Sequence, residues 1–366
     1  MKILLLQDFL RVGGTEKQAL FLARTFREAG HATELLLFEP GGHLATREML
    51  DGIKVSALQP CRTGLPLLAP GLMRAVAQRK PEVILCMGRT ANCYAGFLQK
   101  RFPGIVVVGT LRTGKMLFPL HHWSVGVVRA VLVNSNWWKR RLLERRFPPE
   151  RIHVVHNAVL LERARGEHRD KRIAMRERFR IGEEECVFLK VATFRPGKRH
   201  RHLLELFARL REENPRLPWR LWLVGDGSEY SRCKRWAAEK GLGTRVRFFH
   251  FQKDPLPYYA AADVAVSASR EDSLPNFLIE AQASGLPVVA YDCRGVRETC
   301  RPGQTGKILR PGDREGFVAA LREFARFPDV RRQWGAGGPA YAGERFSRES
   351  QALATLRFLE QVTITT

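Results

Sequence analysis

The most informative part of the sequence is Arg270-Glu271-Asp272-Ser273-Leu274-Pro275-Asn276-Phe277-Leu278-Ile279-Glu280-Ala281. It is followed directly by a second informative stretch, Gly285-Leu286-Pro287-Val288-Val289-Ala290. Two carboxylates of the first stretch, Asp272 and Glu280, lie eight residues apart. The sequence between and after them predicts a helix followed by a buried strand.

The predicted helix begins after Asp272, because Ser273 and Pro275 are residue types typical of a helix start. The apolar residues 277–279 indicate a helix that packs on a sheet, and residues 286–290 indicate the next buried strand. A helix N-terminus presents N–H groups that suit phosphate. One carboxylate then lies beside that terminus and the other about two turns along. Such a site fits a nucleotide diphosphate, with hydroxyl groups held at each carboxylate.

The length and hydrophobicity of the chain favour a two-domain globular protein. Its 366 residues exceed what one hydrophobic core usually organises, and 45% of them are hydrophobic. No run of 18 apolar residues occurs, so no membrane span is expected. The start, residues 1–8, has too short an apolar core for a signal peptide and reads as a first strand. We therefore expect a cytoplasmic location.

The charge of the chain is strongly positive: 61 Lys and Arg stand against 37 Asp and Glu, a formal net charge of +24. Such a chain is attracted to polyanions, namely nucleic acid, an anionic bilayer or an acidic substrate. An arginine-rich composition without function is the alternative. The seven cysteines are scattered and form no CxxC pair, which favours free thiols over disulfides or a zinc site.

The pattern along the chain predicts two successive β/α series, each giving a doubly wound parallel sheet, which makes the fold class α/β. The first series covers residues 1 to about 160, and the second begins near Cys186. Between them, residues 162–180 are mostly charged and are predicted to be an exposed connection with an amphipathic helix. We expect a first domain over 1–164 and a second over 165–345. Residues 346–366 are expected to form a closing helix that packs back toward the first domain.

Two glycine-rich turns follow predicted strands. Gly13-Gly14 opens the first helix, and Gly225-Asp226-Gly227 follows the strand at 220–224. Glycine lets a ligand approach the backbone, and a helix start favours phosphate. Each motif alone is weak, because a purely structural turn explains it almost as well. Gly13-Gly14 does not belong to a GxGxxG fingerprint.

A basic loop, Phe194-Arg195-Pro196-Gly197-Lys198-Arg199-His200, follows the first strand of the second series. Its position at the carboxyl end of a parallel strand favours ligand binding. Arg195 and Lys198 are suited to hold a diphosphate. The alternative is a solvated basic loop, which is common in so basic a chain.

In combination and in this order, these motifs cover both halves of the chain and resemble those of a family 4 glycosyltransferase of the GT-B fold, in which two Rossmann-like domains face each other across a cleft. The stretches that carry the resemblance are Gly13-Gly14, Lys198, Gly225-Asp226-Gly227, Tyr259 with Ala262-Asp263, Asp272 to Glu280, and Gly285 to Val289.

The resemblance implies a retaining hexosyltransferase that uses a nucleotide-diphosphate sugar, with UDP as the favoured nucleotide, and that needs no cofactor or metal. By analogy, Arg195 and Lys198 neutralise the diphosphate, Asp272 holds hydroxyls of the donor sugar, and Glu280 holds those of the ribose. Asp272 is thereby expected to be catalytic. The remaining donor-binding residues that it implies are Gly13, Gly14, Gly225, Asp226, Ser273, Leu274, Pro275 and Asn276.

The chain departs from the family pattern at three positions. The first carboxylate of the pair is Asp272 instead of Glu, and Thr193 occupies the position of a common Arg, for which Arg195 is a replacement. Arg112 stands where many members have a His near the sugar. An arginine is always protonated and is no base, but it can stabilise a phosphate or orient an acceptor phosphate. We expect Arg112 to be catalytic in that sense and assign no general base.

Two stretches combine cations with large apolar residues: Lys115–Trp123 and, more strongly, Trp137–Phe147. The second is predicted to be a basic amphipathic helix that rests on an anionic bilayer. A core-facing helix with a basic outer face is the alternative. We expect a protein peripheral to the inner face of the cytoplasmic membrane, with a phosphorylated lipopolysaccharide core or another lipid-linked glycan as acceptor.

Two other functions remain open at this point. A nucleic-acid-binding α/β protein explains the charge but not the pair of carboxylates, and no basic-aromatic motif for nucleic acid occurs. We therefore expect no nucleic-acid partner. A GT-B enzyme that epimerises or phosphorolyses sugars is the other possibility.

Overall fold

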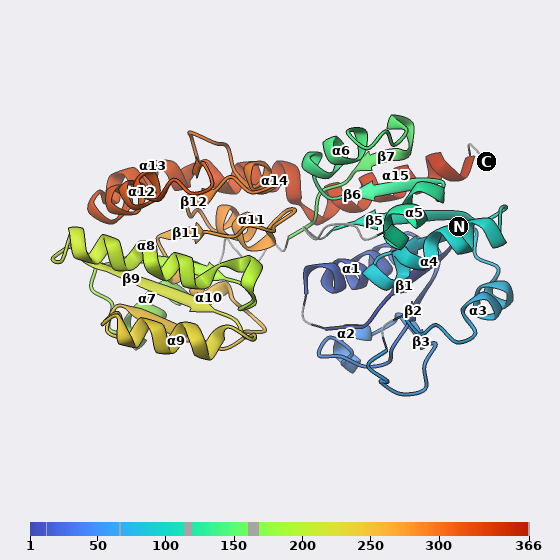
Figure 1. The fold of residues 1–366 in the computed structure, drawn as a ribbon, viewed down its shortest axis with the longest axis horizontal. Coiled ribbons are helices and arrows are strands. Elements are labelled where there is room, and N and C mark those ends of the chain that lie inside the picture. The colour runs from blue at the N-terminus through green and yellow to red at the C-terminus, as the bar shows by residue number, and fades with distance from the viewer. Residues whose placement is uncertain (12, 66, 113–118, 160–167, 365–366) are drawn as a thin grey trace. The chain divides into compact units, whose positions relative to one another are not determined.

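The structure is a computed structural model that describes residues 1–11, 13–65, 67–112, 119–159 and 168–364. The chain divides into two compact units (Figure 1). Unit 1 comprises Met1–Ala158 and Glu349–Thr366, and unit 2 comprises Val159–Arg348. The expected domain boundary at 164/165 lies outside the described residues, as does the first part of the expected connection.

Unit 1 is built on a parallel sheet. Among the described residues its seven strands run in the order β3-β2-β1-β4-β5-β6-β7. The strands are β1 (Lys2–Gln7), β2 (Ala32–Leu37), β3 (Lys54–Ala57), β4 (Val83–Cys86), β5 (Val106–Leu111), β6 (Ala130–Val133) and β7 (Ile152–Val154). The central strands are almost wholly apolar and buried, as expected for a parallel sheet covered on both faces.

Helices cover both faces of this sheet. One face packs against α1 and α15, and the other packs against α3, α4, α5 and α6. The helices are α1 (Gly14–Glu28), α2 (Arg47–Leu50), α3 (Leu72–Arg79), α4 (Arg89–Arg101), α5 (Pro119–Val127), α6 (Asn136–Leu143), the 3-10 turn η1 (Pro149–Arg151) and α15 (Arg348–Ile364).

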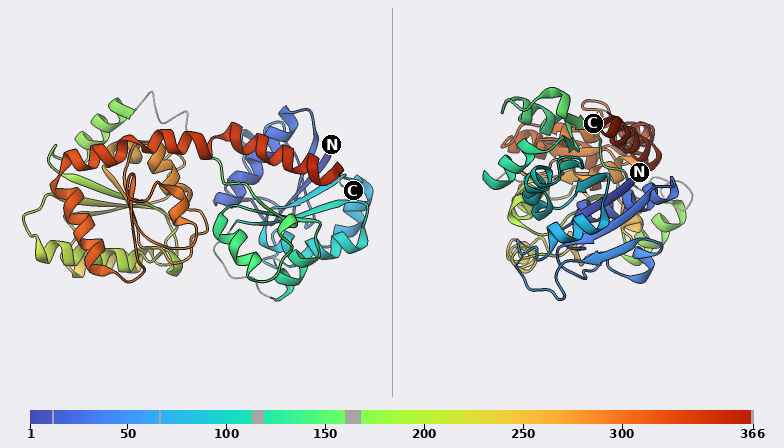
Figure 2. Two further views of the ribbon diagram at one scale, coloured as in Figure 1. Left: turned by 90° about the horizontal axis from the view of Figure 1, so that it is seen from above. Right: turned by 90° about the vertical axis from the view of Figure 1, so that its right-hand side faces the viewer.

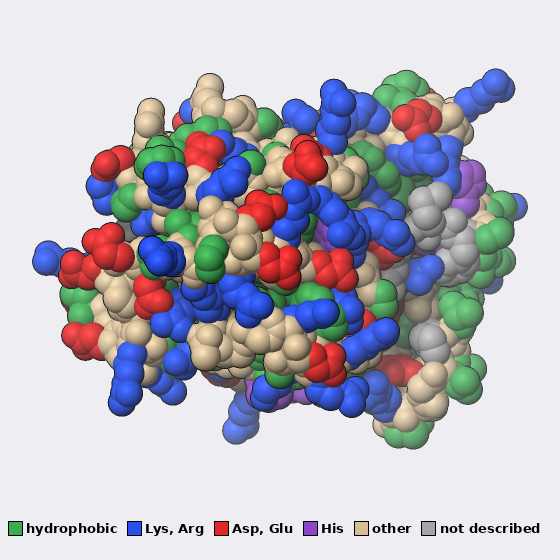
Figure 3. Space-filling view, turned by 60° about the vertical axis from the view of Figure 1, so that its left-hand side comes forward, with side chains coloured by type: hydrophobic (Ala, Val, Ile, Leu, Met, Phe, Trp, Pro, Cys, Tyr) green, Lys and Arg blue, Asp and Glu red, His purple; other side chains and the backbone are tan. Residues whose placement is uncertain are grey.

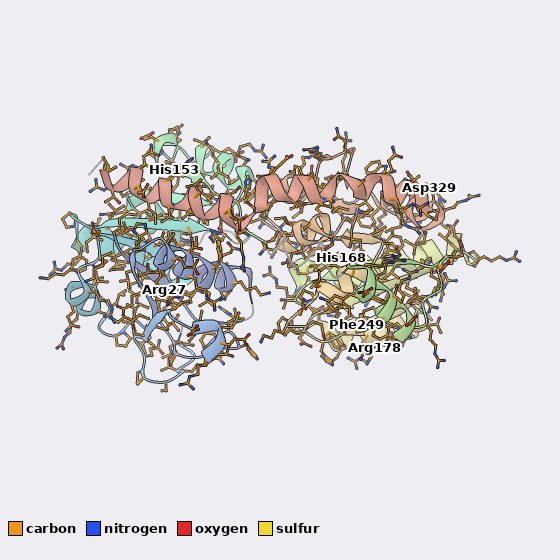
Figure 4. The ribbon with its side chains drawn as sticks, turned by 180° about the vertical axis from the view of Figure 1, so that it is seen from behind. Arg27, His153, His168, Arg178, Phe249 and Asp329 are labelled. Carbon is orange, nitrogen blue, oxygen red and sulfur yellow. The ribbon has the colours of Figure 1, made fainter. Side chains whose placement is uncertain are left out.

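The helix α15 belongs to the core of unit 1 although it lies at the other end of the sequence. Phe358 and Leu359 are buried in that core, and the ring of Phe358 lies 4.5 Å from the ring of His153 (Figure 4). Near the end of α15, Thr363 lies beside Met1, with its hydroxyl 3.9 Å from the methionine sulfur (Figure 2). The last helix thus completes the face on which α1 also packs.

Unit 2 has the same architecture. Among the described residues its six parallel strands run in the order β10-β9-β8-β11-β12-β13. The strands are β8 (Cys186–Val191), β9 (Trp219–Val224), β10 (Val246–Phe249), β11 (Val264–Ser267), β12 (Val288–Tyr291) and β13 (Gly306–Leu309). The two sheets confirm the expected α/β class with two doubly wound Rossmann-like domains.

The sheet of unit 2 is also covered on both faces. One face packs against α8, α9 and α12, and the other packs against α7, α10 and α11. The helical elements are α7 (His168–Arg178), η3 (Pro196–Lys198), α8 (His200–Glu213), α9 (Tyr230–Glu239), α10 (Leu256–Ala261), α11 (Asn276–Ala283), η4 (Val296–Thr299), α12 (Arg314–Arg326), α13 (Pro328–Ala336) and α14 (Gly338–Phe346). Phe249, labelled in Figure 4, joins Trp222, Tyr258 and Phe179 in an aromatic cluster on the second face.

The helix α6 corrects the expectation for Trp137–Phe147. Trp138 and Leu142 are buried in the core of unit 1, and Phe147 is nearly so. Most of the large apolar side chains of this stretch are therefore engaged by the protein, and its outer face carries the cations together with Leu143, which is exposed. This arrangement is the core-facing alternative. Of the other stretch, residues 115–118 lie outside the described residues.

Candidate active site

The site in unit 2 lies where the strand order of the sheet reverses. Strand β8 pairs with β9 on one side and with β11 on the other. The connections that follow β8 and β11 therefore leave toward opposite faces, and ligands of open parallel sheets bind outside the strand ends at such a point. The loop after β8 carries Lys198, and the loop after β11 carries Asp272. The two side chains meet there in an ion pair between Nζ and Oδ1.

Asp272 is almost fully buried, and burial by itself favours the neutral acid. The charge of the Lys198 ammonium and its hydrogen bond outweigh that effect and lower the pKa of Asp272. The carboxylate is consequently ionised at neutral pH, held by a cation from the basic loop. An ionised carboxylate accepts hydrogen bonds from sugar hydroxyls, which is the chemistry expected of this residue.

The helix α11 begins at Asn276, four residues after Asp272, and Pro275 is its N-cap. No side chain caps this terminus, since proline has no side-chain acceptor. Ser273, Leu274 and Pro275 are buried in the turn that leads from Asp272 into the helix.

Glu280 lies one turn from the end of α11 and has a partner that the sequence did not reveal. The hydroxyl of Tyr259, on α10, donates a 2.6 Å hydrogen bond to Glu280 Oε2. Burial and the neighbouring Glu280 carboxylate raise the pKa of Tyr259, so the phenol stays protonated and remains a donor. Besides packing in the core of unit 2, Tyr259 thereby fixes one oxygen of the Glu280 carboxylate.

The motif Gly225-Asp226-Gly227 is required for the close approach of two loops. Gly225 and Gly227 have φ values of +143° and +149°, which residues with a side chain rarely adopt. A Cβ at Gly225 would lie 2.3 Å from the carbonyl oxygen of Ala192, and one at Gly227 would lie 2.3 Å from that of Phe194. The loop after β9 is thus pressed against the basic loop that carries Arg195 and Lys198.

Asp226 projects from this turn and is about half exposed. One of its oxygens lies 2.5 Å from Nδ1 of His250, and the other accepts a 2.8 Å bond from the backbone N–H of Phe251. These two hydrogen bonds lower the pKa of Asp226. Asp226 therefore connects the carboxyl ends of β9 and β10. Arg195 lies in the adjoining loop and is partly buried. Its backbone N–H donates a hydrogen bond to the carbonyl oxygen of Thr193.

Gly13 and Gly14 belong to unit 1, at the start of α1. Gly13 is the N-cap in extended conformation, and no side chain caps the helix. A Cβ on Gly13 would lie 2.3 Å from Oε2 of Glu16. Asp8, which directly follows β1, accepts 3.0 Å bonds from the N–H groups of Thr90 and Ala91 and so caps α4, a role that the sequence did not indicate.

Arg112 also belongs to unit 1 and follows β5. Only 9% of its side chain is exposed. Nη1 donates a 3.0 Å bond to Asn157 Oδ1, whereas Nε and Nη2 meet no partner among the described residues. Burial lowers the pKa of Arg112 to about 10, which leaves it protonated at neutral pH. A buried cation with open donors and no carboxylate partner in the described structure favours an anionic ligand.

The structure brings together the predicted residues of the second domain. Lys198 and Asp272 are in direct contact. Arg195 lies in the same loop as Lys198, and the turn Gly225-Asp226-Gly227 packs against that loop. Glu280 lies on α11, the helix that follows Asp272. No group of His, Cys, Asp and Glu in the described ranges forms a metal-binding cluster. Nor is any helix there long and apolar enough to cross a membrane.

Comparison with known proteins agrees with this geometry. The model of "Glycosyltransferase Family 4" matches residues 12–163, and that of "Glycosyl transferases group 1" matches residues 171–340. The lipopolysaccharide core biosynthesis glycosyltransferase LpsE of Rhizobium meliloti is 36% identical over 38% of this chain and 41% of its own length. The D-inositol 3-phosphate glycosyltransferase of Streptomyces scabiei is 32% identical over 57% of this chain and 48% of its own. The regions that match this chain thus make up less than half of the length of each of these two relatives.

A similar fold occurs in the crystal structure of Anabaena Alr3699/HepE in complex with UDP-glucose. It superposes with a TM-score of 0.83 at 20% identity, over 99% of this chain and all of that one. The two Rossmann-like units therefore define the GT-B class. Within that class, the two family matches show that the chain belongs to the glycosyltransferases of family 4.

Proposed function

We propose that this chain transfers a sugar, with retention of configuration, from a UDP-sugar to a hydroxyl of a lipid-linked glycan. The observation that carries this proposal is the ion pair of Lys198 and Asp272 at the strand-order reversal of unit 2. A bound diphosphate would take over the Lys198 ammonium as its counter-charge. Asp272 would then be released to accept hydrogen bonds from the sugar. Pairing before binding keeps Asp272 ionised and holds both side chains in position.

The chemistry follows from these charges. The bond between the anomeric carbon and the diphosphate breaks while the acceptor oxygen bonds to that carbon. Negative charge accumulates on the departing diphosphate, which takes up the proton of the acceptor hydroxyl. Fixed cations and helix N–H groups stabilise such charge without reorganisation. In this proposal Lys198, Arg195 and the start of α11 supply that stabilisation, with no metal, and Glu280 accepts the ribose hydroxyls. The UDP-glucose complex of HepE, a protein of the same fold, supports the choice of donor.

On the acceptor side, Arg112 is the proposed contact to a phosphate. Its guanidinium is buried, protonated and supplied with two open donor atoms in the described structure. A phosphorylated lipopolysaccharide core fits these donors, and the name of the relative LpsE supports that class. The name of the Streptomyces relative, which contains inositol 3-phosphate, also supports a phosphorylated acceptor.

The proposed location is the inner face of the cytoplasmic membrane, reached through the α4–α5 surface. We define this surface as Phe97, Leu120 and Trp123, with exposed fractions of 43%, 38% and 36%. The rings of Phe97 and Trp123 lie 4.7 Å apart, and Lys100 Nζ lies 5.2 Å from the centre of the Trp123 ring. Exposed aromatic rings bordered by cations are typical of proteins that bind an anionic interface.

The positive charge of the chain supports the same location. In the view of Figure 3, Lys and Arg side chains are spread over the surface with Asp and Glu among them. The exposed outer face of α6 adds Arg140 and Arg141 close to α5, since Phe147, which follows α6, contacts His122 of α5. A partner of extended negative charge, such as a bilayer, matches so dispersed a set of cations.

The test is a screen of nucleotide sugars for donor hydrolysis and transfer, with wild type beside Lys198→Ala and Glu280→Ala. Wild type is expected to prefer UDP-sugars. Lys198→Ala is expected to lose at least about 100-fold in activity, the size of effect of removing one stabilising donor, and Glu280→Ala is expected to lose activity because the ribose hydroxyls lose their acceptor. Lys234→Ala, on the exposed face of α9, is the matched control. Full activity of both site variants would overturn the assignment of the donor site. Product analysis with and without acceptor separates transfer from epimerisation or phosphorolysis.

A further inference from the structure

Strand β8 contains a lysine that the donor site described above does not use. Its sequence, Cys186-Val187-Phe188-Leu189-Lys190-Val191, has a single charged residue in an otherwise apolar strand. Lys190 has no exposed surface at all. An isolated buried ammonium is costly, so its retention in the core requires specific partners.

The partners of Lys190 are the two loops of the donor site. Its Nζ donates a 2.9 Å hydrogen bond to the carbonyl oxygen of Lys198 and lies 3.3 Å from Oγ of Ser269. Ser269 lies three residues before Asp272 and also contacts the hydroxyl of Ser267 at 3.1 Å. One ammonium therefore connects the backbone of the basic loop to the loop that carries Asp272, directly beneath the Lys198–Asp272 pair.

The charges around Lys190 are mainly positive. Lys198 and Arg199 from the basic loop disfavour its charged form, and Asp272 from the loop after β11 together with Cys293 after β12 favour it. His200, at the start of α8, is kept neutral by its own burial and by Lys190 and Lys198. Burial, followed by the Lys198 charge, lowers the pKa of Lys190 to about 7. A bound diphosphate would add negative charge to this group of cations and favour its protonated form.

We propose that Lys190 is a positioning residue for the donor diphosphate: its amino group connects the two loops, and where it is neutral in the free site it takes up a proton from solvent and becomes an ammonium when a nucleoside diphosphate binds. This inference rests on the proposed function of the same site. It makes donor affinity dependent on pH near neutrality. Above a pH of about 7 the free site has lost the proton and must regain it on binding, so affinity falls by up to tenfold per pH unit.

The experiment is titration calorimetry of the full chain with UDP at about pH 8, where UDP itself is fully ionised, in two buffers of different ionisation enthalpy. The difference between the buffers gives the number of protons taken up. Wild type is expected to take up a substantial fraction of one proton, and Lys190→Met none, with weaker binding whose pH profile is flat between about 7 and 9. Lys307→Met, a strand lysine at the far edge of the same sheet, is expected to behave as wild type.

The outcomes separate the two proposals. Wild type that binds UDP without proton uptake overturns the role of Lys190, whatever the state of the variant. Equal proton uptake by wild type and by a folded Lys190→Met variant also overturns the role of Lys190. Failure of wild type to bind UDP, GDP or ADP overturns the proposed function and with it this inference. A melting temperature of Lys190→Met no lower than that of wild type, as expected when a buried charge becomes apolar, shows that loss of binding is not loss of fold.

Discussion

The hydroxyl of Tyr259 lies 2.6 Å from Oε2 of Glu280 and donates a hydrogen bond to it. The tyrosine comes from α10 and the glutamate from α11, so the bond orients the carboxylate from a second element. In Tyr259→Phe the carboxylate loses this donor while the ring and its packing remain. We expect the KM for the nucleotide sugar to rise about 5- to 20-fold with little change in kcat, since one hydrogen bond to a charged group is worth roughly 1.5–3 kcal/mol and only part of it bears on the ligand. Tyr258→Phe, its neighbour in the helix, is the control; equal effects of both would show that Glu280 is not the reason.

Gly225→Ala should destabilise unit 2. The added Cβ would lie 2.3 Å from the Ala192 carbonyl oxygen, and the φ of +143° is unfavourable for alanine. Strain of this kind costs about 1–3 kcal/mol. Chemical denaturation measures the change in free energy of unfolding. Gly243→Ala has no atom within 4 Å of its Cβ and should change stability little, so similar losses in the two variants would contradict the close-approach argument.

The pair of Lys198 and Asp272 predicts a response of stability to acid. The pKa of Asp272 is lowered in the folded protein, so its ionised form stabilises the fold at pH values above its ordinary pKa near 3.8. That contribution is lost as the pH falls through the lower folded-state pKa. We expect the free energy of unfolding of wild type to fall more steeply below pH 3.8 than that of Asp272→Asn. If the free energies of unfolding of wild type and Asp272→Asn fell in parallel with pH, the prediction would be contradicted. Glu344→Gln, which removes an exposed ion pair with Arg301, should leave the slope unchanged.

Arg112→Met should weaken binding of the acceptor without affecting hydrolysis of the donor. Loss of the guanidinium removes the proposed phosphate contact, so the KM for a phosphorylated acceptor is expected to rise at least about 10-fold, the size of a charge-assisted hydrogen bond. Hydrolysis of the donor without acceptor should be unchanged, and the melting temperature should not fall, because a buried unpaired charge is replaced by an apolar chain. An equal loss of donor hydrolysis would contradict an acceptor role. A dephosphorylated acceptor provides the control, since the KM of the variant for it should equal that of wild type.

The α4–α5 surface predicts where the chain contacts a bilayer. Phe97→Ser with Trp123→Ser should reduce sedimentation with anionic vesicles at low salt by about 10-fold or more, because two exposed rings leave the interface. Phe327→Ser, also an exposed phenylalanine (47%), is the matched control in unit 2. Equal sedimentation of wild type with neutral and anionic vesicles would contradict the electrostatic part of the proposal, and unchanged binding of the double variant would contradict the surface.

The elements with strong patterns were predictable from the sequence. The sequence pattern predicts strands over residues 2–7, 246–249 and 264–267 and helices over 256–261 and 276–283, and these ranges are those of β1, β10, β11, α10 and α11. The pattern also predicts a helix over residues 67–78, but α3 begins at Leu72, because Pro70 precedes Gly71, which takes a left-handed conformation at the N-cap. The elements β13, α12, α13 and α14 were not expected, although α12 has a clear amphipathic pattern and begins after the capping residue Asp313.

The site was predictable in its parts and not in its contacts. The spacing of Asp272 and Glu280 located the helix and its carboxylates, but the hydrogen bond from Tyr259 joins residues 21 positions apart and leaves no local pattern. Lys190 illustrates the opposite case: a charged residue inside an apolar strand was visible in the sequence, and only the paired strands β8 and β11 show what its ammonium reaches. The membrane surface was assigned to α6 because an amphipathic pattern does not say whether protein or lipid covers the apolar side.

The return of α15 to unit 1 has a consequence for how the protein forms. Gln351 of this helix donates a 2.8 Å bond to the side chain of Gln18, which in turn holds the carbonyl of Ala158, so the first unit is closed by residues from both sides of unit 2. During synthesis one face of the sheet of unit 1 stays partly uncovered until α15 has been translated. Because α15 follows unit 2 in the sequence, this happens only after all of unit 2 has left the ribosome. The second unit can complete its own core earlier, and so the half of the molecule that is translated first is the half that finishes folding last.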